Sequence, residues 1–148
     1  MSIRIALYQP DIPQNCGAMM RLCAGLGVGL DIIEPCGFIL DDRKLRRVGM
    51  DYVPLSDRQR FSSWDAFLEG RAQNRHILMT TKVEQSYFDF EFQDGDILIA
   101  GSESSGVPLD IHQSLPHKVT IPMFGDARSL NVVTATAMIA GEALRQTR

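Results

Sequence analysis

The last third of the chain contains a loop whose residue types could bind a ligand. The apolar run at residues 97–100 (Ile-Leu-Ile-Ala) is typical of a buried strand, and Gly101, Glu103 and Gly106 follow it at once. Glycines after a strand let the backbone approach a ligand closely, because no Cβ stands in the way. Glu103 places a carboxylate in the same loop, where it could contact the ligand.

Two further segments continue this pattern of strand, loop and helix. Residues 119–123 (Val-Thr-Ile-Pro-Met) read as a strand that Pro122 stops, and residues 129–131 (Ser-Leu-Asn) lead into a helix-forming run at 132–145. Loops that begin or end on buried elements can line one pocket with backbone N–H and C=O groups. Each segment alone is also compatible with an ordinary turn or helix cap, so the prediction rests on their combination.

A fourth segment lies near the N-terminus, where Asn15, Gly17 and Arg21 form the pattern Asn-x-Gly-x-x-x-Arg. Together with the Gly-x-Glu-x-x-Gly, Ile-Pro-Met and Ser-Leu-Asn segments, this pattern resembles the motifs of the SPOUT superfamily of RNA methyltransferases. The resemblance runs along the whole chain and is strongest to the TrmL type, the tRNA (cytidine/uridine-34) 2′-O-methyltransferases. The chain departs from that type where Val133 and Thr134 replace the usual serine and asparagine.

The resemblance implies a reaction and a fold. The expected reaction transfers a methyl group from S-adenosylmethionine to the ribose 2′-hydroxyl of cytidine or uridine 34 of tRNA, with leucine tRNAs as substrates and without a metal. The expected fold is an α/β domain with a mainly parallel sheet flanked by helices and a C-terminal trefoil knot. General folding rules favour an unknotted chain, so the knot is implied by the resemblance alone.

The resemblance also implies roles for individual residues. Residues expected to lie against the cofactor, largely through backbone groups, are Met79, Gly101, Ile121, Ser129 and Leu130. Residues expected in the catalytic site are Asn15, Arg21, Glu103 and Asn131. Without the family argument, the apolar members of this set would be read as core residues, and Gly101 and Ser129 as a turn and a helix cap.

Arg21 has two alternative tasks in such a reaction. A ribose hydroxyl is a poor nucleophile at neutral pH, so it must lose its proton or be held by a strong hydrogen-bonding group. A guanidinium holds its proton too firmly to be a good base. Positioning the hydroxyl, or clamping a neighbouring phosphate with two hydrogen bonds, is the easier role, and a salt bridge on the first helix is the structural alternative.

Composition is that of an ordinary globular protein. The 148 residues suit a single domain at 1–148, and the hydrophobic (45%) and charged (22%) fractions fit a soluble chain. Because no run of 18 apolar residues and no signal-like N-terminus occur, we expect a cytoplasmic protein that does not enter a membrane. Cys16, Cys23 and Cys36 lack Cys-x-x-Cys spacing, so reduced thiols and no metal site are expected.

The net charge of −3 argues against indiscriminate binding to nucleic acid, because phosphate contacts need lysine and arginine. A local basic segment could still bind RNA. One such segment contains Arg43, Lys44, Arg46 and Arg47, and Arg58 and Arg60 follow it. A solvated helix face is the alternative interpretation of this segment.

Aromatic residues alternate with other side chains at residues 87–92 (Tyr-Phe-Asp-Phe-Glu-Phe). This pattern predicts a strand or an extended loop that packs Phe88, Phe90 and Phe92 on the core. Bases could stack on the same rings, but no lysine or arginine is interleaved with them, which favours packing.

The remaining pattern predicts strands alternating with helices. Strands are expected at 2–8, 30–33, 52–55, 76–81, 97–100 and 119–123, and helices from Asn15 to about 26, at 41–48, from 62 onward and at 132–145. Asn15 is expected to cap the first helix, and Ser62 and Asp65 to form a capping box. The alternation argues for an α/β domain with a mainly parallel sheet.

The C-terminal helix is apolar around nearly its whole circumference, which a surface helix of a small monomer does not tolerate. The helix after Asn15 is similarly apolar, so the two helices are expected to form a symmetric dimer interface. The resemblance implies the same, because members of that superfamily are typically homodimers whose active site takes residues from both subunits. Two alternative functions stay open: methylation of another tRNA or ribosomal RNA ribose, and a non-catalytic RNA-binding module.

Overall fold

The computed structural model describes residues 2–40 and 58–148. Strands alternate with helices along these residues, which confirms the predicted α/β class. The order is β1 (Arg4–Tyr8), α1 (Pro13–Leu26), β2 (Gly29–Ile33), β3 (Arg58–Phe61), α3 (Trp64–Gly70), β4 (His76–Met79), the short 3-10 helix η2 (Tyr87–Asp89), β5 (Ile97–Ala100), α4 (Leu109–Ser114), β6 (His117–Val119) and α5 (Val132–Thr147). Over these ranges, no helix is long and apolar enough to cross a membrane.

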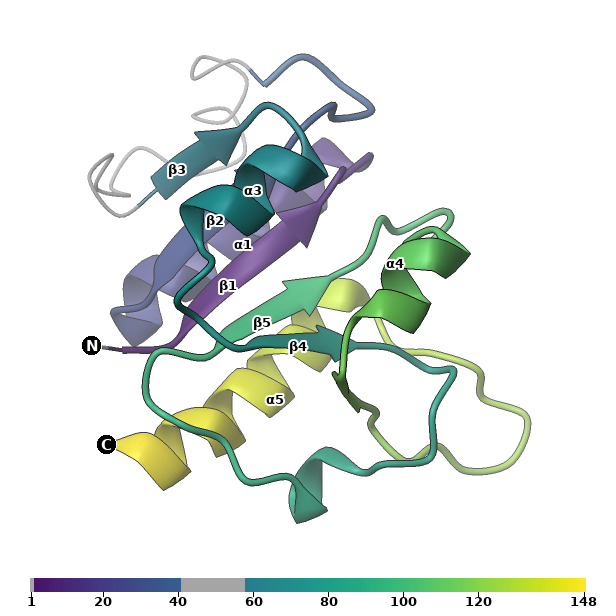
Figure 1. Cartoon of the computed structure of the whole chain (residues 1–148). Coiled ribbons are helices and arrows are strands. Elements are labelled where there is room, and N and C mark those ends of the chain that lie inside the picture. The colour runs from purple at the N-terminus through teal and green to yellow at the C-terminus, as the bar shows by residue number, and fades with distance from the viewer. Residues whose placement is uncertain (1, 41–57) are drawn as a thin grey trace.

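The described strands form one six-stranded sheet in the order β3-β2-β1-β5-β4-β6. Every neighbouring pair is parallel, so the predicted mainly parallel sheet is confirmed. A parallel sheet needs cover on both faces, because its strands are apolar on both sides. Figure 1 shows this cover, with α1 and α5 behind the sheet and α3 and α4 in front of it.

The core is divided by the sheet into two layers. Ile5 and Leu7 of β1 belong to the larger layer, which contains the buried residues of α1 and α5. Ala6 and Tyr8, which alternate with them, belong to the smaller layer with Phe67 of α3 and residues of α4. Successive side chains of a strand point to opposite faces, so β1 joins both layers through alternate residues.

The first helix begins two residues earlier than expected. Asn15 was predicted to cap it, but α1 begins at Pro13, and Ile12 is the residue at the N-cap position without a side-chain cap. Proline is well suited to a first helical position, because its fixed φ matches the helix and its missing N–H would have no partner there. At the other end Gly27 stops the helix with a φ of 68°, which lies in the left-handed region.

The strand predicted at 119–123 is placed wrongly. β6 covers only His117–Val119, and its last partner is Met79, the final residue of β4. Beyond that pair the neighbouring strand has ended, so the β-branched residues after Val119 have no ladder to continue. Thr120 keeps a single bridge, to Ser86, and the following residues form a loop.

The aromatic segment is neither a strand nor uniformly packed on the core. Tyr87 begins a 3-10 helix and is buried, whereas Phe88 stacks on it with 65% of its surface exposed. Phe92 is buried and Phe90 packs against the larger core layer, as expected. Ser86 accepts a hydrogen bond from the N–H of Phe88 and starts a helical turn. In a helical turn the side chains no longer alternate between two faces, so Phe88 and Phe90 do not point the same way as in a strand.

Smaller differences concern caps and short elements. The cap of α3 is Ser63, whose Oγ accepts a hydrogen bond of 3.0 Å from the N–H of Ala66, and not the predicted pair of Ser62 and Asp65. Neither β3 nor α4 was expected. The predicted helix at 41–48, the predicted strand at 52–55 and the basic residues Arg43, Lys44, Arg46 and Arg47 lie outside the described residues.

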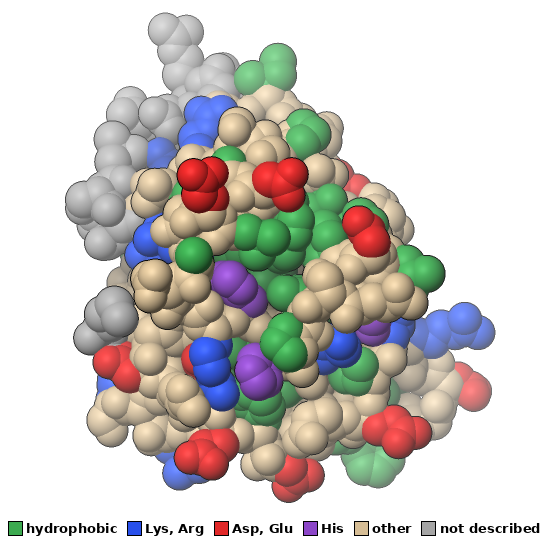
Figure 2. Space-filling model, in the orientation of Figure 1, with side chains coloured by type: hydrophobic (Ala, Val, Ile, Leu, Met, Phe, Trp, Pro, Cys, Tyr) green, Lys and Arg blue, Asp and Glu red, His purple; other side chains and the backbone are tan. Residues whose placement is uncertain are grey.

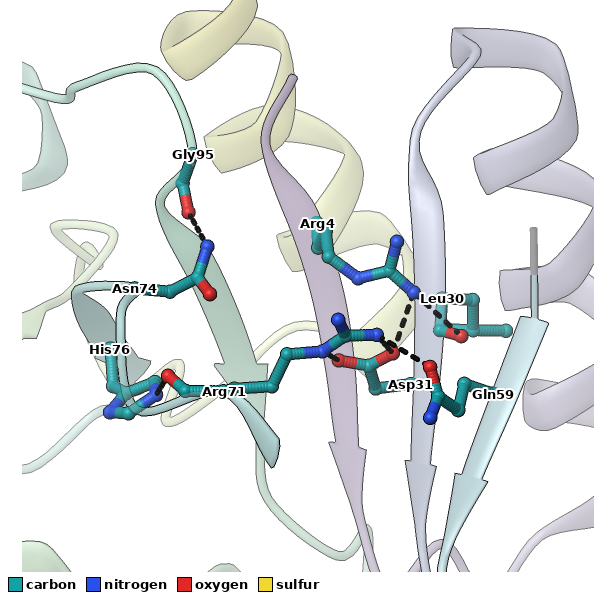
Figure 3. A network of polar contacts seen from close by, with 8 residues as sticks. All are labelled: Arg4, Leu30, Asp31, Gln59, Arg71, Asn74, His76 and Gly95. Atoms are coloured by element: carbon teal, nitrogen blue, oxygen red, sulfur yellow. Dashed lines mark hydrogen bonds and ion pairs between the residues drawn. The ribbon is translucent and has the colours of Figure 1, made fainter. Parts of the chain in front are cut away.

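A buried carboxylate links the neighbouring strands β1 and β2 to the end of α3 (Figure 3). Asp31, in the middle of β2, is fully buried and accepts a hydrogen bond of 2.6 Å from Arg4 of β1. Arg71, at the end of α3, binds both carboxylate oxygens of Asp31 at 2.8 and 2.9 Å. This bidentate pair raises the pKa of Arg71. Because Arg4 and Arg71 lie near the amino ends of β1 and β4, the network holds the opposite end of the sheet from the cavity described below.

Candidate active site

A cavity of about 610 Å³ opens at the carboxyl ends of β4 and β5. Its wall contains Met79 at the end of β4, the loop 101–106 after β5, and Ile121 after β6, and the first turns of α5 close it. In open parallel sheets, ligands bind in the crevice outside the carboxyl ends of the strands. The cavity therefore lies where this fold offers a binding site.

Eight of the nine residues predicted for catalysis or cofactor binding line this cavity. They are Asn15, Met79, Gly101, Glu103, Ile121, Ser129, Leu130 and Asn131. Their positions in the chain are far apart, so the fold brings the four sequence motifs to one place. Their individual tasks stay predictions, which the geometry below makes specific.

The loop after β5 is closed on itself by two backbone hydrogen bonds. The N–H of Gly106 donates to the carbonyl of Ser102 at 2.8 Å, and the N–H of Ser102 donates to the carbonyl of Gly106 at 3.1 Å. A Cβ at position 101 would lie 2.8 Å from the backbone of Gly106, too close for any side chain. Glycine at 101 is therefore required by the close approach of two backbone segments.

Two carboxyl groups meet at the rim of the cavity. The backbone N–H of Asp11 donates to Oε2 of Glu103 at 2.9 Å, and the hydroxyl of Ser104 donates to Oδ2 of Asp11. Burial raises the pKa of Glu103, and the hydrogen bond with the Asp11 side chain raises it further. The hydrogen bonds with Glu103 and Ser104 hold the pKa of Asp11 at about 2. The sequence did not predict Asp11 as a site residue, because nothing in the local pattern connects it with Glu103.

Asn131 has a structural task that the sequence did not predict. Its Oδ1 accepts hydrogen bonds from the N–H groups of Val133 at 2.8 Å and Thr134 at 3.3 Å, so it is the N-cap of α5. Its Nδ2 donates to Oδ1 of Asn15 at 3.3 Å, which joins two motifs 116 positions apart. Asn131 thus fixes the start of α5 relative to the first turn of α1.

Arg21 is the one residue predicted for catalysis or cofactor binding that does not line the cavity as the structure describes it. It lies on the exposed face of α1, six residues beyond Asn15 and on another side of the helix. Ala18 is exposed on the same stripe of α1. A single copy of the described chain therefore holds the cavity and Arg21 apart.

The thiols and the half-buried His76 have no catalytic character. Burial raises the pKa of Cys16 and of Cys23 to about 12, so both stay protonated near neutral pH and are poor nucleophiles. His76 lies at the amino end of β4, with its ring 3.1 Å from the carbonyl of Arg71, and burial lowers its pKa. These groups belong to the scaffold.

Comparison with known proteins identifies the family. The model of the SpoU rRNA Methylase family matches residues 2–141. A tRNA (cytidine(34)-2′-O)-methyltransferase of Beijerinckia indica is 52% identical over 144 residues, which cover 96% of this chain and 90% of that protein. The enzyme of the same name from Escherichia coli K12 is 42% identical over 146 residues, covering 97% of this chain and 93% of that protein.

Solved structures agree with these relatives. A structure described as giving insights into the 2-OH methylation of C/U34 on tRNA has a TM-score of 0.91 at 40% identity, covering 98% of this chain and 95% of that chain. The SpoU methyltransferase AviRb of Streptomyces viridochromogenes, in complex with the cofactor AdoMet, has a TM-score of 0.81 at 25% identity, covering 98% of this chain and 60% of that chain. The family model, the sequences and the folds agree over almost the whole length, and the chain belongs to the SpoU rRNA methylase family.

Proposed function

We propose that this protein transfers a methyl group from S-adenosylmethionine to the ribose 2′-hydroxyl of nucleotide 34, a cytidine or uridine, of tRNA. The relatives named for this reaction match nearly the whole chain at 52% and 42% identity. The observation that carries the proposal is the cavity at the carboxyl edge of the sheet, lined by eight of the nine residues predicted for catalysis or cofactor binding. We also propose that the protein is cytoplasmic, where tRNA is available to it.

The cavity fits a cofactor of this kind. Its volume of about 610 Å³ lies within the range of small-molecule sites, about 300–1,000 Å³. Its wall combines buried apolar side chains with the backbone of three loops, and one buried hydroxyl in it, that of Thr136, has no hydrogen-bond partner. We propose that Met79, Gly101, Ile121, Ser129 and Leu130 hold S-adenosylmethionine there. When bound, this cofactor supplies an electrophilic methyl group on a sulfonium sulfur.

The chain itself contributes mainly positioning. Glu103, joined to Asp11, holds the loop after β5 in place, and Asn131 fixes the start of α5 opposite that loop. Both residues lie at the cavity, where the ribose must approach the methyl group in line. We propose that Arg21 holds the 2′-hydroxyl or an adjacent phosphate by hydrogen bonds, since its guanidinium is a strong donor and a poor base.

We propose that Arg21 reaches a cavity from a second copy of the chain, because it does not line the cavity of its own described residues. α1 and α5 cover the same face of the sheet, and their outer sides expose apolar surface, including Ala18 and Met138, the latter 40% exposed. Leu130, at the cavity, is 39% exposed. We therefore propose a homodimer built on α1 and α5 in which Arg21 of each copy completes the site of the other.

Two further features of the fold are proposals. We propose that residues 1–148 form one domain, because all six described strands belong to one sheet. We also propose a C-terminal trefoil knot, with α5 threaded through the connection between β4 and β5. In support, Thr120 pairs with Ser86 of this connection, and the side chain of Gln146 binds the backbone of Phe90 and Phe92 at 3.0 and 2.8 Å.

RNA binding is proposed for the basic segment at Arg43, Lys44, Arg46 and Arg47. On the face shown in Figure 2, the lysine and arginine side chains of the described residues are scattered among acidic ones and form no continuous basic patch with one another. Arg60, which follows that segment in the chain, donates a hydrogen bond of 2.6 Å to Glu34. Charge reversal at Arg46 and Arg47 should therefore weaken tRNA binding and flatten its dependence on salt.

The deciding experiment is the transfer of labelled methyl from S-adenosylmethionine to tRNA taken from cells that lack this protein. Nuclease mapping then locates the label. Label on the ribose of nucleotide 34 supports the proposal, and the purified tRNAs that accept it identify the isoacceptors. Label on another ribose would change the substrate, while cofactor binding without transfer would favour a non-catalytic RNA-binding module.

A further inference from the structure

One residue that lines the cavity has a buried hydroxyl without a hydrogen-bond partner. Thr136, in the second turn of α5, is 1% exposed, and its Oγ1 contacts no donor or acceptor of the described chain. A threonine inside a helix commonly bonds to the carbonyl four residues earlier, but Thr136 does not. Of the three buried side-chain atoms of described residues that lack a partner, only this one belongs to a residue that lines the cavity.

The surroundings of Thr136 are otherwise apolar. Among the described residues that line the cavity, the buried ones are Leu78, Ala100, Val119, Thr136 and Ile139. The other polar side chains of the wall, such as those of Glu103 and Asn131, are partly or fully exposed. The cavity therefore has a buried apolar end with one hydroxyl in it, and a polar mouth. A buried polar group without a partner is costly, so such a hydroxyl is expected to have a partner in the ligand.

This inference rests on the proposed function, which supplies the ligand. S-Adenosylmethionine has a carboxylate, an ammonium and a sulfonium in its methionine part, and burying any of these charges in an apolar pocket is unfavourable. The adenine base is uncharged and flat, with apolar faces and hydrogen-bonding groups along its edge. We propose that the adenine base occupies the buried end of the cavity and that the Thr136 hydroxyl hydrogen-bonds to its edge. Thr136 is then a residue that selects adenine.

The test compares three variants by calorimetric titration with S-adenosylhomocysteine. Thr136→Val keeps the shape of the side chain and removes the hydroxyl, whereas Thr136→Ser keeps the hydroxyl. Thr134→Val is the matched control, because Thr134 lies exposed on the same helix and does not line the cavity. We expect Thr136→Val to weaken binding about tenfold, Thr136→Ser to stay within about twofold of the wild type, and the control to bind normally.

A second measurement separates recognition from a structural role. Removing a hydroxyl that has no partner should leave the melting temperature of the ligand-free protein unchanged or raise it, while it weakens binding. A hydroxyl needed for folding would instead lower the melting temperature. The analogue in which hypoxanthine replaces adenine, together with the 3-deaza and 7-deaza analogues, then identifies the atom that Thr136 contacts. For the analogue that lacks this atom, the wild type and Thr136→Val should bind equally.

The outcomes distinguish this inference from the proposed function. Equal affinity of Thr136→Val and the wild type for S-adenosylhomocysteine would overturn the role of Thr136 and leave the proposed function intact. Weaker binding that is the same for every base analogue would also overturn it. Failure of the wild type to bind S-adenosylhomocysteine would overturn the proposed function and this inference with it.

Discussion

The backbone N–H of Asp11 donates a hydrogen bond of 2.9 Å to Oε2 of Glu103 and thereby joins the loop after β1 to the loop after β5. The side chains of the two residues interact as well, and the pKa of Asp11 falls to about 2 while that of Glu103 rises. Between these two pKa values, the pair holds one proton and one negative charge. The rim of the cavity therefore contains a neutral carboxyl group over part of the acidic pH range.

Asp11→Asn should lower the pKa of Glu103. The substitution removes the negative charge that opposes ionisation of Glu103, although burial still raises the pKa. A titration of the Glu103 carboxyl carbon by NMR measures the change, with Glu103→Gln to assign the signal. An unchanged midpoint would show that burial alone sets the pKa of Glu103.

The same pair predicts how stability depends on pH. The pKa of Glu103 is raised by folding, so its contribution to stability is full below the pKa of the unfolded chain and is lost as pH rises through the folded pKa. The pKa of Asp11 is lowered, so its contribution is present above the unfolded pKa and is lost as pH falls toward about 2. Urea unfolding of the wild type and Asp11→Asn across this range should differ in slope, and parallel curves would contradict the coupling.

Gly101→Ala should weaken cofactor binding while the protein still folds. The new Cβ would lie 2.8 Å from the backbone of Gly106, so the loop after β5 must shift. Overpacking of this kind costs about 1–3 kcal/mol, which corresponds to about fivefold to 150-fold weaker affinity if the loop carries the cost. Titration with S-adenosylhomocysteine measures it. The control is Gly25→Ala, where a Cβ meets nothing within 4 Å.

Asn131 allows its structural and functional tasks to be separated. Asn131→Ala removes the cap of α5 and should cost about 1 kcal/mol of stability, whereas Asn131→Ser retains a capping oxygen and should stay near the wild type. Both variants lose the hydrogen bond to Asn15, so both should lose about tenfold to a hundredfold in methyl transfer. Melting curves and transfer rates measure the two effects, and a fully active Asn131→Ser would reduce Asn131 to a cap.

The sequence predicted the elements that contain a run or a periodic pattern of buried apolar residues. The sequence segments of β4, β5 and α5 are apolar because a parallel sheet is covered by helices on both faces. This pattern can be recognised in each segment without knowing which element it packs against. The end of β6 could not be predicted in this way. Thr120 and Ile121 have the residue types of a strand, but the neighbouring strand stops at Met79, so the ladder ends there and Thr120 keeps a single bridge, to Ser86. Strand length was decided by the partner.

The site was predictable where its residues form motifs and unpredictable where only the fold joins them. Glu103 belongs to a motif, while Asp11 meets it across 92 positions and has no local signal. Thr136 left a weaker signal, a polar residue at a helix position whose neighbours one turn away are core residues. Arg21 was recognised by its motif, but a single copy of the chain does not bring it to the cavity.

Asp31→Ala should strongly destabilise the fold without touching the cavity. Asp31 is fully buried and binds Arg4 and Arg71, so its removal leaves two guanidinium groups without their carboxylate. Breaking a buried pair by removing one partner costs about 3–5 kcal/mol, and the partial exposure of both arginines favours the lower value, about 3 kcal/mol. Urea unfolding measures the loss. Arg60→Ala, which breaks the more exposed pair with Glu34, should cost about 1 kcal/mol or less.

Mixing two inactive variants tests whether Arg21 acts across the proposed dimer. Arg21→Ala should bind S-adenosylhomocysteine normally and transfer no methyl group. Gly101→Ala should be nearly inactive at a cofactor concentration that saturates the wild type but lies far below the dissociation constant of this variant, and it supplies a normal Arg21 beside a damaged cavity. In a mixed dimer, the intact cavity of the first variant meets the intact arginine of the second. Because half of the dimers in an equilibrated equal mixture are mixed and each has one good site, about a quarter of the wild-type activity should return.

The result depends on which copy supplies the arginine. If Arg21 served the cavity of its own chain, each site in the mixed dimer would contain one of the two defects, and the mixture would stay as inactive as its parents. Each variant alone, treated with the same mild denaturant and refolded, gives the background. Return of activity only after the two variants have exchanged subunits would establish a shared site. It would also explain why Arg21 lies apart from the other residues of its motif within one copy of the chain.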